Sequence, residues 1–320
     1  MLIINIGDNM KKRKVKKSVF IKLGLFVIII VLAIIGVKYF LYRQTNEFKL
    51  KEIGYSIEEI KTIEDELSGN QISTLLEKKY NADLAKVIKE KYFIYDNLDR
   101  YLAYRVKEES RSMKDVIGIV NANADKDFYT DVKASDTNKG NLILVNKYYK
   151  LTEAYQPKDI VPISTWYAYS NHSTKEEVYG KYKEMWSAAK AEDLTLIVTS
   201  SFRDFDFQKE LYEGYKESDG QEWADSIAAR PGHSEHQLGL ALDIVTHGST
   251  MDNFDQTDEF KWLKDNSYKF GFILRYPKEK EYITGYSYES WHYRYVGESV
   301  AKEVYDQGIT YDEYYAYYVK

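Results

Sequence analysis

Hydrophobic and polar positions divide the chain into an apolar run near its start, an amphipathic stretch and a long mixed region. Residues 23–37 contain no charged side chain, and Lys22 and Lys38 lie close enough to the ends to reach a membrane surface. A helix needs roughly 20 apolar residues to cross a bilayer, and this run reaches that length with its flanks. We therefore predict one transmembrane helix over residues 18–42.

Basic residues before this helix predict its orientation. The first 17 residues contain a basic cluster, made of Lys11, Lys12, Arg13, Lys14, Lys16 and Lys17. Only Arg43 and Lys49 follow the helix closely, so the positive-inside rule places residues 1–17 in the cytoplasm and everything downstream outside the cell. No small-x-small cleavage site follows the apolar run, which favours an uncleaved, single-pass anchor in the cell membrane over a signal peptide.

Residues 43–113 are polar and carry the spacing of amphipathic helices. Isoleucines recur every three or four residues from Ile53 to Ile63, and turn-forming residues interrupt the pattern near Gly54 and at 68–70. This pattern predicts a small helical stalk. A plain spacer that holds the next domain away from the membrane is an equally open interpretation, because nothing in this stretch carries chemistry.

Strand-like and helix-like patterns alternate over residues 114–320, and we place a domain boundary near residue 113. Short β-rich runs predict strands at 117–121, 141–146, 194–199, 272–277 and 289–296. Apolar stripes predict a helix over about 259–270 and another that begins at 173–177, with Val178, Tyr182, Met185, Trp186 and Ala189 on its buried face. The mixture predicts an α+β domain.

The segment 230–245, which reads RPGHSEHQLGLALDIV, concentrates groups that bind cations. Its later part alternates large and small residues with the period of a strand, which ends near the carboxylate of Asp243. An unpaired charge in a buried strand is costly, so Asp243 needs a partner, and a metal ion or an arginine would serve. His233 and His236 supply imidazoles just before it, and Gly239 lets the backbone bend between them.

Composition narrows the chemistry of such a site. The chain has no cysteine, so any metal must be held by histidine and carboxylate. The formal net charge is −5, and because the basic cluster lies at the start, the remainder is clearly acidic. An acidic remainder argues against nucleic-acid binding.

Histidines, carboxylates and an arginine form a candidate hydrolytic site. Catalytic zinc usually takes three protein ligands, and His236, Asp243 and His292 would supply them from separate segments. Glu289, three residues before His292, would take a proton from the metal-activated water. Arg203, at a predicted strand-to-helix turn, would hold a substrate carboxylate or an oxyanion.

Spacing alone leaves other interpretations of these histidines open. His236 and His292 would also be compatible with purely structural roles. His172, His233 and His247 compete with them as ligands, although His233 would need a different turn to reach the same ion.

Four blocks of sequence carry a resemblance to a known family. Ser234–Asp243, which reads SEHQLGLALD, resembles the SxHxxGxAxD motif of the zinc D-alanyl-D-alanine carboxypeptidases of the VanY type, peptidase family M15. The blocks SSFR at 200–203 with Gln208, GFILRYP at 271–277 and ESWHYRYVG at 289–297 are similar to further blocks of that family, in the same order. The similarity spans roughly residues 116–305. Departures are the pair Ser201-Phe202, where Gly-Tyr is common, and the extra histidine at 233.

The resemblance implies roles for individual residues. His236, Asp243 and His292 would bind Zn²⁺, and Glu289 would be the general base. Arg203, with Gln208 and Ser234, would bind the terminal carboxylate of the substrate or the developing oxyanion. Arg275 would support the site by pairing with Asp243 or another acid, or would form a structural salt bridge, and Trp291 and Tyr293 would be wall or core residues beside the site.

The resemblance also implies a fold and a function. The fold would be the small α+β domain shared by these peptidases and hedgehog signalling domains. The protein would be a membrane-anchored zinc D,D-carboxypeptidase that removes the C-terminal D-alanine from peptidoglycan stem peptides by attack of a zinc-bound water. Two alternatives are an L,D-carboxypeptidase that trims tetrapeptide stems and a non-catalytic wall-binding module. The second is disfavoured because the three ligands and the base are all present.

Overall fold

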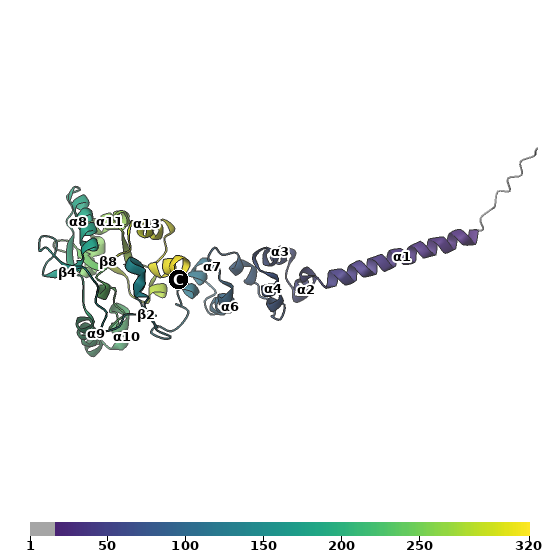
Figure 1. Ribbon diagram of the computed structural model, residues 1–320, viewed down its shortest axis with the longest axis horizontal. Coiled ribbons are helices and arrows are strands. Elements are labelled where there is room, and N and C mark those ends of the chain that lie inside the picture. Colours follow the sequence, from purple (N-terminus) through teal and green to yellow (C-terminus); the bar gives the residue numbers. More distant parts are fainter. Residues whose placement is uncertain (1–16) are drawn as a thin grey trace, which may run out of the picture. The chain divides into compact units, whose positions relative to one another are not determined.

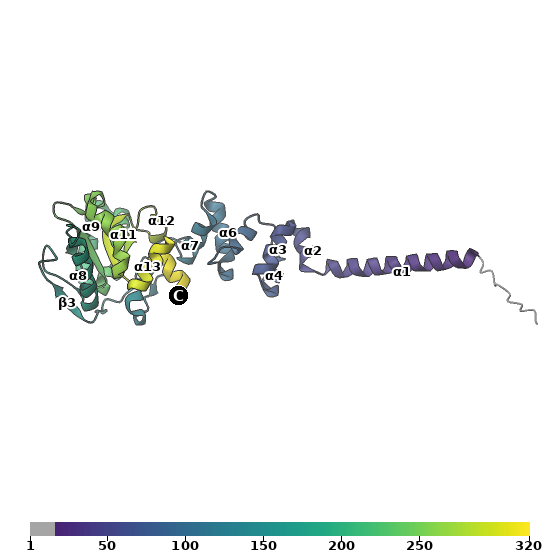
Figure 2. The ribbon, with the colours of Figure 1, turned by 90° about the horizontal axis from the view of Figure 1, so that it is seen from above.

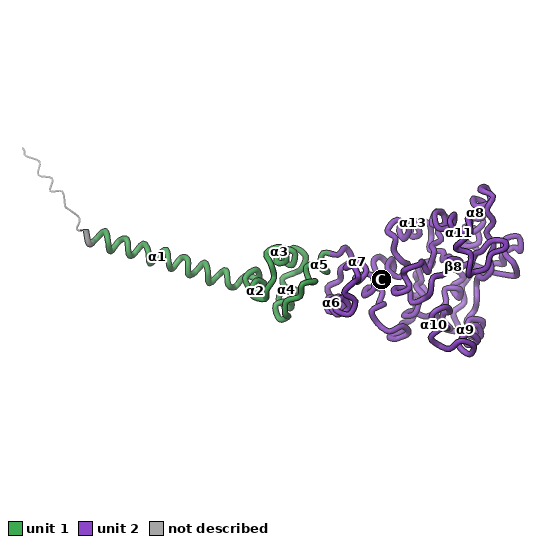
Figure 3. Tube along the Cα trace, turned by 180° about the vertical axis from the view of Figure 1, so that it is seen from behind, with its two compact units in different colours: residues 1–89 green, residues 90–320 purple. Residues whose placement is uncertain are grey.

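The computed structural model describes residues 17–320, which form two compact units that meet between Lys89 and Glu90 (Figure 3). The boundary expected near residue 113 falls inside the second unit, between α6 (Leu98–Lys107) and α7 (Met113–Asn121). The basic segment predicted over 1–17 lies, apart from Lys17, outside the described residues.

The first unit begins with the long apolar helix α1 (Lys17–Arg43). Residues 19–43 of this helix have a mean hydropathy of 3.0 in their most apolar window, and none of that window is buried. The helix is therefore long and apolar enough to cross a membrane, as the sequence predicts.

Short helices follow α1 in the first unit. They are α2 (Asn46–Ile53), α3 (Ile57–Glu66), α4 (Gly69–Leu75) and α5 (Leu84–Ile88). Gly54 ends α2 in the left-handed conformation with φ 118°, and Ser56 and Ser68 begin α3 and α4 with capping boxes. The breaks predicted from the turn-forming residues are confirmed, and Ile60 and Ile63 are buried as the spacing indicates.

A four-stranded antiparallel sheet organises the second unit. Its strands are β5 (Ile197–Ser200), β6 (Ala241–Val245), β7 (Phe272–Tyr276) and β8 (Glu289–Tyr295), in the order β5-β6-β8-β7. Two-stranded sheets pair β1 (Lys133–Ala134) with β2 (Tyr149–Lys150) and β3 (Ile160–Ile163) with β4 (His172–Lys175). The α+β class predicted from the sequence is confirmed.

Helices cover both sides of the sheet. In Figure 1, α8 (Glu176–Lys190) and α11 (Asp258–Asn266) lie on one side of β8, and α9 (Phe205–Asp219) and α10 (Gln221–Ile227) lie on the other. The predicted stripe of α8 packs into the main core with Leu242, Phe272 and Tyr293, which leaves the α9–α10 side of the sheet for the cavity described below.

Short helices and turns complete the second unit (Figure 2). The helices are α12 (Glu281–Thr284), α13 (Glu298–Gln307) and α14 (Tyr311–Tyr314). The 3₁₀ turns are η1 (Tyr95–Asn97), η2 (Thr137–Leu142), η3 (Glu235–Leu238), η4 (Met251–Gln256) and η5 (Ser267–Phe270), and a π-helical turn, η6 (Tyr315–Val319), ends the chain.

Two predicted strands are absent from the described residues, whereas the helix predicted to begin at 173–177 begins within that range. Residues 117–121 belong to α7, because Ser112 caps a helix whose apolar residues are buried on every side, so strand-like composition misled the prediction. Of residues 141–146, the first two end η2 and the last four are buried, with the isolated bridge Asn146↔Tyr149 as the only strand-type pairing among these described residues. Helix α8 begins at Glu176, because residues 172–175 pair with β3 as β4.

Gly239 joins η3 to β6 in a left-handed conformation that favours glycine, and close neighbours leave little room for a side chain there. Its φ is +67°, and an added Cβ would lie 2.7 Å from Ile160 Cδ1 and 3.2 Å from Lys175 Cγ. We expect Gly239→Ala to lower the free energy of unfolding by about 1–3 kcal/mol, measured by urea denaturation. Gly248→Ala is the control, because φ is +79° there but nothing lies within 4 Å. An equal loss of unfolding free energy in both variants would show that the close contacts with Ile160 and Lys175 add nothing to the destabilisation.

Candidate active site

The register of the central sheet places Asp243 of β6 opposite His292 of β8. Residues directly opposite each other on neighbouring strands project their side chains from the same face of the sheet. In agreement, Asp243 Oδ1 lies 3.2 Å from His292 Nδ1, and both side chains are buried. The sheet alone therefore joins two of the residues singled out in the sequence.

His236 reaches the same point from η3, the 3₁₀ turn before β6. Its Nδ1 lies 2.6 Å from the backbone oxygen of Ser201, to which it donates a hydrogen bond. That hydrogen bond leaves Nε2 as the free nitrogen, and Nε2 lies 3.4 Å from Asp243 Oδ2. The backbone N–H of Arg203 also donates to His236 O, at 3.3 Å, so the turn after β5 and the turn before β6 are fixed to each other.

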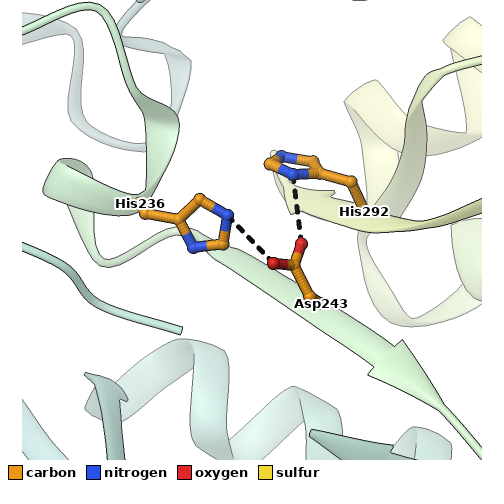
Figure 4. A group of neighbouring side chains, drawn as sticks. All are labelled: His236, Asp243 and His292. Atoms are coloured by element: carbon orange, nitrogen blue, oxygen red, sulfur yellow. Dashed lines mark ion pairs between the residues drawn. The ribbon is translucent and has the colours of Figure 1, made fainter. Parts of the chain in front are cut away.

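His236, Asp243 and His292 have the geometry of a metal site (Figure 4). One ligand atom from each lies within 4.8 Å of the others, and all three residues are buried. Zinc bonds of about 2.0–2.2 Å at tetrahedral angles separate ligand atoms by roughly 3.3–3.5 Å, close to the 3.2 and 3.4 Å between the carboxylate oxygens and the two imidazoles. Asp243 Oδ1 accepts no hydrogen bond from the described residues, so a cation there would satisfy it. The residues present therefore fit Zn²⁺.

The charges of His236 and Asp243 also suit a metal ion. Burial lowers the pKa of His236 to about 4, so the ring is neutral at pH 7, which is the form that binds metals. Burial opposes ionisation of Asp243, but the neighbouring His236 and His292 hold the pKa of its carboxyl well below the usual range. A neutral imidazole beside an ionised carboxylate is the state that a divalent cation needs.

Glu289 lies beside this group because of an irregularity in β8. Residues three apart in a regular strand face opposite sides, but the register between β7 and β8 shifts between Leu274 and Tyr276. This shift brings Glu289 Oε2 to 3.5 Å from His292 Nδ1. Burial raises the pKa of Glu289 to about 8, which marks it as a carboxylate able to take and give a proton near neutral pH.

A cavity of about 380 Å³ opens over these residues, and Arg203, Gln208 and Ser234 line it. Arg203 Nε and Gln208 Oε1 have no hydrogen-bond partner among the described residues. The Gln208 amide nitrogen donates to Ala229 O at 2.8 Å, and Ser234 Oγ accepts from the backbone N–H of His236 at 3.3 Å. An arginine without a carboxylate partner at the wall of a cavity is available to an anionic substrate group.

The competing histidines lie elsewhere. His233 Nδ1 donates to Asn146 O at 2.7 Å, and its ring packs edge-on against Tyr129 at 5.0 Å, outside the metal group. His247 is exposed and contacts Tyr169, and His172 is half-buried with Nε2 3.1 Å from Ser170 Oγ. The structure thus separates His233 from His236, which spacing alone left as competitors.

His233 predicts acid sensitivity of the fold. Burial lowers its pKa to about 4 from 6.5, so the unfolded chain takes up a proton at a higher pH than the folded chain does. Its contribution to stability is therefore present above pH 6.5 and is lost as the pH falls toward 4, by about 3 kcal/mol at most. We expect the stability difference between wild type and His233→Gln to shrink over this range in urea unfolding curves. A difference that stays constant with pH would contradict this.

Sequence reasoning missed Glu235, Arg294 and Asp312. Glu235 lies between two residues of the motif and is buried, 1% exposed, beneath the metal group. Arg275, which the sequence left between two kinds of partner, pairs with Glu235 at 2.7 Å and with Asp312 at 2.6 Å. For Glu235 and Arg294, the available signal was a charged side chain within a segment predicted to be buried. Nothing in the sequence near Asp312 points to this site.

Comparisons with known proteins agree with this geometry. The sequence model of the VanY family, described as D-alanyl-D-alanine carboxypeptidase, matches residues 171–298. YodJ of Bacillus subtilis (strain 168) is 38% identical over 201 residues, which cover 59% of this chain and 74% of that protein. A D-alanyl-D-alanine carboxypeptidase of Enterococcus faecalis is 40% identical over 141 residues, which cover 41% of this chain and 52% of that protein.

A solved structure is similar as well. The LD-carboxypeptidase LdcB is 37% identical with a TM-score of 0.56, and the match covers 59% of this chain and 91% of that structure. Residues 171–298, which the family model matches, contain the central sheet, the metal group and the residues that line the cavity. The chain therefore belongs to the VanY family of D-alanyl-D-alanine carboxypeptidases and is a zinc metallo-carboxypeptidase.

Proposed function

We propose that this chain, anchored by α1, removes the C-terminal D-alanine from peptidoglycan stem peptides on the outer side of the cytoplasmic membrane. In this proposal His236, Asp243 and His292 bind the zinc ion, and Glu289 is the general base. The observation that carries the proposal is the buried group of two imidazoles and a carboxylate, with Glu289 beside it, at the wall of a cavity.

Zinc held by these ligands would polarise the scissile carbonyl and lower the pKa of a water molecule toward 7. Glu289 takes the proton of the attacking water on its carboxylate and then passes it to the amine of the departing D-alanine. Glu289 Oε2 lies 3.5 Å from His292 Nδ1, and Glu289 is not a member of the group formed by His236, Asp243 and His292, which supports a role as the base beside the ligands.

Arg203 binds the terminal carboxylate of the stem peptide. Its Nε has no hydrogen-bond partner among the described residues, and the unpartnered Gln208 Oε1 lies along the same cavity with Ser234. Two guanidinium N–H groups can bind both oxygens of a carboxylate, which would fix the last residue of the substrate relative to the scissile bond. The chain as a whole is acidic, so its overall field does not attract a substrate with a carboxylate. The local positive charge of Arg203 attracts it instead.

The sequence around α1 supports the proposed membrane orientation. The basic cluster before the helix favours a cytoplasmic N-terminus, which leaves the catalytic unit outside the cell, where peptidoglycan lies. Helix α1 is long and apolar enough for one crossing. Labelling of an engineered cysteine in the second unit by a membrane-impermeant reagent on intact cells tests this orientation, and labelling only after lysis would contradict it.

Product masses from defined muropeptides test the reaction itself. The zinc-loaded full chain is expected to shorten a pentapeptide stem by one alanine and to release free D-alanine. A tetrapeptide stem is the matched substrate for the alternative L,D activity. Shortening of the tetrapeptide alone would replace the D,D assignment, and no product from either substrate with zinc bound would leave only a binding role.

A further inference from the structure

The second ring nitrogen of His292 faces a buried carboxylate that the proposed reaction does not use. Nδ1 of His292 lies 3.2 Å from Asp243 on the metal side, and Nε2 lies 3.4 Å from Glu235 Oε2 on the opposite side. With Nδ1 directed at the metal, Nε2 carries the ring proton and donates a hydrogen bond to Glu235 Oε2. Such a carboxylate fixes the tautomer and orientation of a ligand histidine and raises its basicity.

Two arginines hold Glu235 in place. Arg275 Nε and Arg294 Nη1 both donate to Glu235 Oε1, at 2.7 and 2.9 Å, and neither arginine is more than 1% exposed. These two ion pairs hold Glu235 as a charged acceptor and leave its Oε2 for His292.

The C-terminal helix α14 supplies the fourth charge of this buried group. Asp312 accepts from Arg275 Nη1 at 2.6 Å and from Nη2 at 3.3 Å, and it also accepts from Asn146 Nδ2 at 2.7 Å. Two arginines thus face two carboxylates, and removal of Asp312 would leave a buried guanidinium with half of its counter-charge. Asp312 lies beyond residues 171–298, the part of the chain that the family model matches.

Contacts on both sides fix α14. Thr310 and Glu313 form a capping box at its start, and Glu313 packs against Gly118 of α7 so closely that a Cβ there would lie 2.6 Å from Oε1. The ring of Tyr311 lies near the guanidinium carbons of Arg294 and Arg275, at 5.2 and 5.6 Å from its centroid. Asp312 is therefore held in a defined position relative to Arg275.

We propose that Glu235 is a positioning residue for His292 and that Asp312 of the C-terminal helix acts through Arg275 to hold Glu235 in that position. The chain Asp312–Arg275–Glu235–His292 then connects the end of the polypeptide to the affinity of the site for zinc. This inference rests on the proposed function only for the assignment of His292 as a ligand. It adds Asp312, which lies outside the family match, to the residues that support the metal site.

Zinc affinity of isosteric variants tests the proposal. We expect Glu235→Gln to weaken zinc binding by about 10- to 100-fold, because the amide no longer provides an ionised acceptor for His292. Asp312→Asn is expected to weaken it less, by about 3- to 10-fold, since it acts through Arg275. Asp125→Asn is the matched control, because Asp125 pairs with Arg100 in the same unit and is expected to leave zinc affinity unchanged. Dissociation constants are measured on the full chain by competition with a chromogenic chelator.

Wild-type zinc affinity in folded Glu235→Gln and Asp312→Asn overturns the proposal, as does an equal loss in Asp125→Asn. If Glu235→Gln does not fold, ¹⁵N shifts of the zinc-loaded wild-type chain decide, with His292 expected to be protonated at Nε2 and metal-bound at Nδ1. The opposite tautomer also overturns it. These readouts do not depend on which peptide bond is cleaved, whereas failure of the wild-type chain to bind zinc would contradict the proposed function itself.

Discussion

Glu289→Gln is expected to lower kcat by about 100- to 10,000-fold while the chain still binds one zinc ion. The amide keeps the shape of the side chain but cannot accept the proton of the attacking water. Glu289 lies beside the metal group rather than within it, which is why zinc should remain bound. The measurement is D-alanine release from a pentapeptide at saturating substrate, with zinc content determined on the same samples.

Glu298→Gln is the matched control for Glu289→Gln. Glu298 begins α13 shortly after β8 and pairs with Lys181 at 2.7 Å on the surface, so the same chemical change there should leave kcat unaltered. Full activity in Glu289→Gln would remove this residue as the base. Loss of zinc together with activity would instead make it a ligand.

His236→Ala is expected to abolish stoichiometric zinc binding, whereas His233→Ala should retain it. The two histidines lie three residues apart and are both buried, at 2% and 6% exposure. Only His236 directs a free Nε2 toward Asp243, at 3.4 Å, and a site that loses one of three ligands loses most of its affinity. Zinc per chain after dialysis, measured by atomic emission, distinguishes the two variants.

Retention of one zinc ion by His236→Ala would contradict the ligand assignment. Loss of zinc in His233→Ala would place the metal nearer to Asn146, with which His233 forms its hydrogen bond. Both variants require a check of folding by circular dichroism, because each histidine also anchors a buried backbone oxygen.

Periodicity predicted the helix α8, because burial of one helix face leaves a repeat of three and four that the sequence displays. The strands β5, β7 and β8 were predicted from short β-rich runs instead, and β7 and β8 are buried on both faces. The β-rich runs at 117–121 and 141–146 failed as predictions, because an apolar run without a repeat fits a helix or an extended segment equally well.

The metal ligands could be predicted from the sequence, but the residues that support them could not. His236, Asp243 and His292 stand in two recognisable sequence blocks, and the chemistry of their side chains limits what they can do together. Glu235 and Asp312 act through charges that meet only after folding, across 40 and 37 residues from Arg275. No local pattern records which buried acid faces which buried arginine, so tertiary structure was needed to find them.

Titration of the metal-free full chain with zinc tests whether one bound ion per chain is needed for the reaction, with D-alanine release from a pentapeptide stem followed in the same samples. Activity is expected to be absent without metal, to rise in proportion to added zinc and to reach a plateau at one equivalent per chain. Undiminished D-alanine release from the metal-free chain, or none at one bound equivalent, would contradict it.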